Sequence, residues 1–177
     1  MDELESELLD FFASRGRFAA RDDYLGMEAS TIPRLLATYF EALDTTRRRR
    51  LVGLLAEIAL GTRPEHAEHI PEATHLLLDL ALRGFTEAFV DVRSALEQEL
   101  TEPEHVVWWS LARDPSPLPT GEDYRHDWHF GLQLWGLLYL LGSSAAGLVY
   151  AELVEKAASA RFREALQRAR AMYDSRG

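Results

Sequence analysis

The sequence has no cysteine and, among its 177 residues, a single lysine, Lys156. The absence of cysteine excludes disulfide bonds, thiolate metal sites and cysteine nucleophiles, and it suits a reducing compartment. The acidic N-terminal stretch has no basic segment of the kind that begins a secretory signal. We therefore expect a cytoplasmic protein, and the arginine-rich, lysine-poor composition is typical of GC-rich bacteria.

The sequence also lacks the short motifs that mark common chemistries. Its glycines stand singly, which excludes a glycine-rich phosphate loop. Ser143 and Ser144 are not set in a nucleophile elbow, and no basic recognition helix of a helix-turn-helix motif is present. We expect no cofactor, and nothing in these patterns argues for an enzyme.

Charge is the main signal in the composition. The net charge is −10 at pH 7, which argues against nucleic acid or an anionic membrane as the partner. Ten acidic residues lie between Pro64 and Glu104, with only Arg83 and Arg93 among them. Two interpretations stay open: these residues form solvated helix faces, or they form an acidic surface that attracts a basic protein.

Apolar residues recur at helical spacing between Thr31 and Gly61. Two stripes have steps of three and four residues: Ile32, Leu35, Leu36, Tyr39, Phe40 and Leu43, then Leu51, Leu54, Leu55 and Ile58. They predict two antiparallel helices joined at Asp44-Thr45-Thr46, with Thr31 as N-cap and Gly61 as C-terminal stop. We expect Arg47 to lay its aliphatic stem along this core.

A second helical hairpin follows. Pro71 is expected in the first turn of its first helix, which Gly84 ends, and Thr86 is expected to cap a second helix that runs through Leu100. The Ile-Pro pairs that open the two hairpins, at 32–33 and 70–71, are 38 residues apart. That period is typical of an α-solenoid.

The segment IPRLLATYFEALDTTRRRRLVGLLAEIALG, followed by a unit that ends in DVRSALEQEL, resembles HEAT-like repeat proteins of GC-rich bacteria. The resemblance covers residues 31–100. It implies a helical scaffold that presents a concave surface to a partner and carries no general catalytic residues.

Beyond Leu100 the chain departs from this repeat. Residues 114–121 contain three prolines and predict an extended loop. The run from Trp128 to Ala151 carries no charged residue, but Gly142-Ser143-Ser144 divides it, so we expect buried helix rather than a membrane span. Two last helices follow, and their inward stripes are expected to include Leu148, Val149 and Leu153, then Leu166 and Met172.

These patterns predict an all-α protein. We expect helical hairpins stacked into a compact right-handed α-solenoid or bundle of about seven to nine helices. Residues 1–177 are expected to form a single domain, with the repeat part at about 31–100, the proline loop at 114–121 and C-terminal helices at 122–174.

The favoured function is a protein–protein interaction module whose partner is another, basic protein. Its most specific form is an acidic immunity protein that neutralises a cognate bacterial toxin, because blocking a basic enzyme requires only a complementary acidic surface. The candidate partner-binding residues are Glu65, Glu68, Glu72, Asp79, Glu87, Asp91, Trp108 and Trp109. The tryptophans have a second interpretation as core residues.

The alternative function is a metal-dependent or small-molecule-binding enzyme. Asp123, His126 and His129 step by three residues along an expected helix, so a carboxylate and two imidazoles could converge on zinc or iron. A second group, Glu65, His66, Glu68, His69, Glu72 and His75, is interrupted by Pro71 and is more typical of a solvated loop. Neither group forms a complete metal motif.

We expect purified protein to contain no stoichiometric zinc or iron. Elemental analysis of untagged protein, prepared without chelator, checks this. One ion per chain, lost in a His126→Ala/His129→Ala variant, would favour the metal-dependent enzyme.

Overall fold

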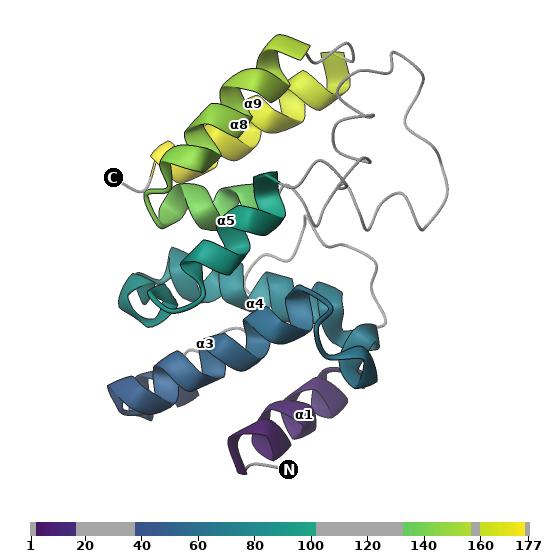
Figure 1. The fold of residues 1–177 in the computed structure, drawn as a ribbon, viewed down its shortest axis with the longest axis vertical. Coiled ribbons are helices and arrows are strands. Elements are labelled where there is room, and N and C mark those ends of the chain that lie inside the picture. Colours follow the sequence, from purple (N-terminus) through teal and green to yellow (C-terminus); the bar gives the residue numbers. More distant parts are fainter. Residues whose placement is uncertain (1–2, 17–37, 102–132, 157–159, 176–177) are drawn as a thin grey trace. The chain divides into compact units, whose positions relative to one another are not determined.

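The computed structural model describes residues 3–16, 38–101, 133–156 and 160–175, and all regular secondary structure in these ranges is helical (Figure 1). The expected all-α class is confirmed for this part of the chain. None of the described helices combines the length and apolar content needed to cross a membrane. The chain divides into two compact units, residues 1–91 and 92–177, and the single domain stays a prediction.

The described part of the first unit consists of three α-helices, two 3-10 helices and one short helical stretch. Its elements are α1 (Glu3–Gly16), a helical stretch at 38–42, α3 (Thr45–Ala59), the 3-10 helix η1 (Pro64–His69), α4 (Ile70–Leu82) and the 3-10 helix η2 (Thr86–Phe89). α3 packs mainly against α4, and the two lie side by side in Figure 1.

The ends of α3 and α4 follow from local sequence. Asp44 caps α3, because its Oδ1 accepts a hydrogen bond of 2.9 Å from the Arg47 backbone N–H. Pro71 lies in the first turn of α4, where its missing N–H leaves no bond unmade. Gly61 and Gly84 follow the two helices with φ of 71° and 92°, a conformation that favours glycine. The predicted break at Asp44 and both stops are confirmed, whereas Thr45 and Thr46 begin α3 rather than belong to the joint, and the expected Thr31 cap lies outside the described residues.

The core of the first unit is the seam between α3 and α4. Its fully buried leucines are Leu51, Leu55, Leu76, Leu77 and Leu80. Each contributes roughly 1.5–3 kcal/mol by leaving water. Leu4, Leu8 and Phe12 of α1 and Phe40 are also buried. The apolar stripe of α1 is therefore part of the core as well.

The helix expected to begin at Thr86 is not continuous. Thr86 instead begins η2, the cap position belongs to Phe85 without a side-chain hydrogen bond, and the next α-helix begins only at Arg93. Asp91 lies in the intervening turn, where Arg49 of α3 holds it through Nε at 2.6 Å. The prediction of a Thr86 cap on a continuous helix was therefore wrong.

The second unit is built around Trp135. Its elements are α5 (Arg93–Thr101), a helical stretch at 133–140, α8 (Ser144–Lys156) and α9 (Ala160–Asp174). Trp135 is fully buried, and its Nε1 donates to the Ala146 carbonyl at 2.9 Å. Gly142, with φ of 69°, separates the 133–140 stretch from α8, which confirms the predicted break in the uncharged run.

Two expected core residues of the second unit face solvent. Leu148 is 74% exposed and Met172 is 48% exposed. Val149 and Leu153 of α8 and Leu166 of α9 are buried as expected, and Tyr173 is buried in place of its neighbour Met172. In α9 the cause is visible, because the ring of Tyr173 packs 5.7 Å from that of Trp135.

Gly136 allows this packing, since a Cβ there would overlap the phenol end of Tyr173. We expect Gly136→Ala to lower the free energy of unfolding by about 1–2 kcal/mol, because a buried ring must move. Urea denaturation followed by circular dichroism measures it.

Gly147→Ala in α8 is the matched control, because no described atom lies within 4 Å of its added Cβ. It should raise stability by about 0.5–1 kcal/mol through helix propensity. Equal effects of the two substitutions would contradict the packing of Tyr173 on Gly136.

Candidate functional site

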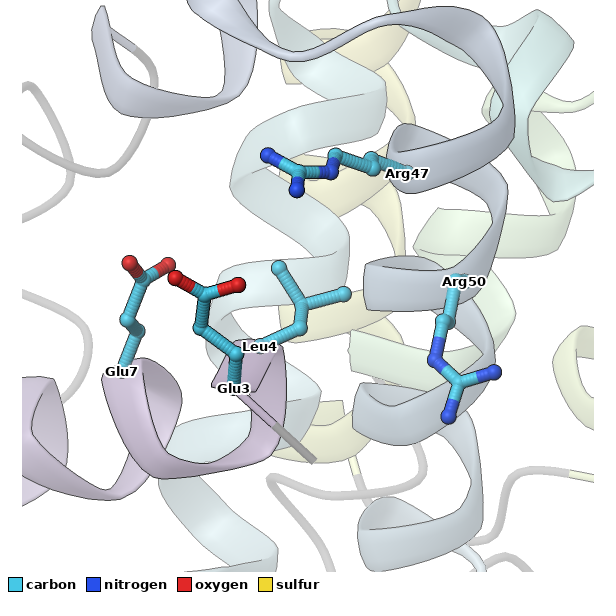
Figure 2. Close-up of a pocket in the computed structure, with 5 residues that line it drawn as sticks. All are labelled: Glu3, Leu4, Glu7, Arg47 and Arg50. Carbon is cyan, nitrogen blue, oxygen red and sulfur yellow. The ribbon is translucent and has the colours of Figure 1, made fainter. Parts of the chain in front are cut away.

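The described part of the first unit contains an open cleft between α1 and α3 (Figure 2). Its volume is about 320 Å³, and its lining residues are Glu3, Leu4, Glu7, Arg47 and Arg50. Figure 2 shows the two carboxylates rising from α1 and the Arg47 guanidinium reaching across from α3. Four of the five lining residues are therefore charged.

Helical spacing places these side chains. Glu3 and Glu7 are four residues apart on α1, and Arg47 and Arg50 are three apart in the first turns of α3, so each pair shares a helix face. The Asp44 cap fixes where α3 begins and hence where these arginines point. Leu4 is buried beneath the charged groups and attaches α1 to the core.

Tyr39 reinforces the carboxylate side of the cleft. Its hydroxyl donates a hydrogen bond to Glu7 Oε2. Partial burial, followed by this bond and the negative charge of Glu7, raises the pKa of Tyr39 from 10.0 to about 12. The phenol therefore stays protonated at neutral pH and acts as a donor.

A second set of contacts holds α1 to η1 and α3. Arg63 Nη1 lies 2.9 Å from Glu5, and its Nε lies 2.7 Å from Glu57. His66 Nε2 is 3.3 Å from the same Glu5 oxygen, and the ring of His69 stacks on Phe12 at 4.6 Å. These contacts connect the helix that carries Glu3 and Glu7 to the rest of the unit.

The four arginines at 47–50 divide into two pairs. Arg48 covers the rings of Phe40 and Phe85, at 5.7 and 5.5 Å, and lies 3.6 Å from Glu87. Arg49 binds Asp91 and lowers the pKa of that carboxyl by its hydrogen bonds. Arg47 is exposed and lines the cleft, so Arg48, not Arg47, lies along the core.

The arginine contacts separate the acidic residues predicted to bind a partner into two groups. Asp79, Glu87 and Asp91 each face an arginine of their own unit, Arg83, Arg48 and Arg49. Glu72 is half-buried, with Oε2 shielded from water. Glu65 and Glu68 on η1 are exposed, and Glu65 lies 3.9 Å from an Arg63 that already serves Glu5 and Glu57. Asp79 and Arg83 form an i,i+4 pair that is visible in the sequence, whereas Glu87 and Asp91 meet arginines of α3, Asp91 across 42 residues, and no local pattern signals these contacts.

The remaining candidates fall outside the described residues. These are Trp108 and Trp109, together with the possible metal ligands Asp123, His126 and His129. Within residues 3–16, 38–101, 133–156 and 160–175, no three His, Asp or Glu side chains are grouped so that they could hold a metal ion. His66 and His69 are engaged separately, by Glu5 and by Phe12.

The cleft suits polar contact better than small-molecule chemistry. Sites for small molecules are mostly enclosed and apolar, whereas this cleft is open and has one apolar residue in its lining. Comparisons of the chain with protein-family models, curated proteins and solved structures gave no match. Charge and exposure are therefore the features of the described residues that bear on function.

We expect Tyr39 to ionise near pH 12. The difference between the alkaline absorbance titrations of wild type and Tyr39→Phe isolates this residue among six tyrosines. Because the folded pKa is raised, the contribution of Tyr39 to stability is complete below pH 10 and is lost as pH rises through about 12.

Glu7→Gln removes the carboxylate acceptor and should move the midpoint of Tyr39 ionisation toward 10. A wild-type midpoint near 10, with the helical circular dichroism signal intact, would contradict the Tyr39–Glu7 contact.

Proposed function

We propose that this chain is a protein-binding module that uses the acidic surface of η1 to contact a basic protein. In its most specific form, the module is an immunity protein that covers a cognate bacterial toxin. The surface is defined by Glu65 and Glu68, and we call it the η1 surface.

The exposure of these two carboxylates is the observation that carries the proposal. The side chain of Glu68 is 77% exposed and that of Glu65 is 55% exposed. The nearest basic group to Glu68 among the described residues is His69, at 3.4 Å, and it carries charge only when protonated. Among the described residues Glu68 has no arginine within 4 Å, and Glu65 shares Arg63 with Glu5 and Glu57, whereas Asp79, Glu87 and Asp91 each face a different arginine.

The charge balance of the whole chain supports a basic partner. With a net charge of −10, the protein attracts cations over about 8–10 Å at physiological ionic strength. Such attraction mainly raises the association rate and selects among partners. The cleft adds exposed carboxylates on α1 that can take part in the same contact.

The HEAT-like arrangement belongs to this proposal. The pairing of α3 with α4, and the stops at Gly61 and Gly84, are compatible with stacked helical hairpins. A right-handed solenoid would present the η1 surface on a scaffold suited to contact rather than to catalysis.

Neutralising the η1 surface should weaken capture of the partner. We expect a Glu65→Gln/Glu68→Gln variant, immobilised and exposed to a lysate of the native host, to retain about three- to tenfold less of the wild-type partner, since each exposed pair is worth up to about 1 kcal/mol. Quantitative mass spectrometry of the captured proteins provides the measurement. Raising the salt concentration should reduce the difference.

Glu155→Gln/Glu164→Gln is the matched control, because it removes two exposed carboxylates from α8 and α9. It should retain the partner as wild type does. Equal loss in both variants, or capture that does not respond to salt, would contradict an acidic contact surface on η1.

A further inference from the structure

Arg170 of α9 lies over two tyrosine rings of the second unit. Its guanidinium carbon is 4.9 Å from the ring centre of Tyr150 and 5.9 Å from that of Tyr139. The tyrosines come from α8 and from the 133–140 stretch, so three helical segments converge on one cation. Both distances are within the range of a cation–π interaction.

The rings of Tyr139 and Tyr150 are held in place by Trp135. The ring of Trp135 lies 5.2 Å from Tyr150 and 5.3 Å from Tyr139. Trp135 is itself fixed by complete burial and by its hydrogen bond to Ala146. The tyrosine faces therefore form a preorganised surface rather than two mobile side chains.

The carboxylate of Asp174 also contacts the Arg170 guanidinium. Asp174 accepts hydrogen bonds from the Tyr139 hydroxyl and, at 3.3 Å, from Arg170 Nε. A carboxylate can accept about four hydrogen bonds, so Asp174 retains capacity for further donors. Aromatic faces with an adjacent carboxylate are what a guanidinium requires of its binding site.

We propose that Tyr139, Tyr150 and Asp174 form a recognition site for an arginine side chain of a partner protein, and that Arg170 occupies this site in the free chain. We call it the guanidinium site. The identity of the ligand as a protein side chain rests on the proposed function, in which the partner is basic. The binding of a guanidinium does not depend on it.

The contacts of Arg170 leave room for its exchange with an external guanidinium. Arg170 reaches Asp174 from the same helix, four residues away, and contacts it only through Nε. An external arginine is free to approach with its two-pronged edge, which binds carboxylates more strongly than a single N–H does. The Arg170 side chain is already 47% exposed, so it returns to water readily. A lysine lacks the flat group that stacks on the rings.

The test uses N-acetyl-arginine methylamide as the probe. We expect Arg170→Ala to bind it saturably, with shifts of the tyrosine ring signals in NMR spectra. The affinity should be about tenfold or more above that of wild type, in which the tethered arginine competes at millimolar effective concentration. N-acetyl-lysine methylamide should bind more weakly than the arginine probe.

Two variants control for charge and for the site. Arg168→Ala removes an exposed arginine from the same helix and should bind as wild type does. Arg170→Ala/Tyr150→Leu should lose the affinity gained by Arg170→Ala. Equal probe affinity in the Arg170→Ala and Arg168→Ala variants, or full affinity without Tyr150, would overturn the proposal.

A direct reading in wild type covers the case in which Arg170→Ala does not fold. High concentrations of the arginine probe should shift the Nε–H signal of Arg170 toward that of a solvated arginine, and no shift at saturating probe would overturn the proposal. If the guanidinium site fails these tests while the η1 variant still loses its partner, the proposed function stands and this inference falls.

Discussion

Burial of the leucine seam between α3 and α4 is the constraint on which the first unit depends. Leu51 and Leu55 on one helix and Leu76, Leu77 and Leu80 on the other are completely shielded from water. The seam fixes the direction of α3, and α3 in turn carries the arginines that reach η2, Asp91 and the cleft. The charged side chains on the surface are thus positioned by the apolar packing of α3 against α4, in which they take no part.

The four arginines at 47–50 determine which carboxylates on that surface are paired. Successive residues of an α-helix are rotated by about 100°, so four adjacent arginines serve different neighbours. Arg48 and Arg49 are opposed by Glu87 and Asp91, and Arg47 and Arg50 line the cleft. The carboxylates on η1 have no such arginine to themselves. Local pairing, rather than the total charge of −10, decides which carboxylates of the first unit lack an arginine of their own.

Helix positions could be predicted from the sequence where a cap or glycine marks the boundary, as at Asp44, Gly61, Gly84 and Gly142. Prediction failed where a tertiary contact sets the outcome. The aromatic packing of Tyr173 leaves Met172 facing solvent, and no local signal marks the turn at Asp91 that interrupts the helix expected from Thr86. The cleft and the guanidinium site each bring together residues that are distant in the sequence. The pattern of residues along one sequence contains no signal for such pairing.

Hydrogen exchange followed by mass spectrometry tests the role of the α3–α4 seam most directly. If burial of the seam holds the first unit together, amides of residues 51–59 and 73–81 will be the slowest to exchange within residues 1–91. They will also open together, with a free energy equal to that of global unfolding. Exchange of α3 and α4 at unrelated rates, or as fast as that of η1, would contradict the account.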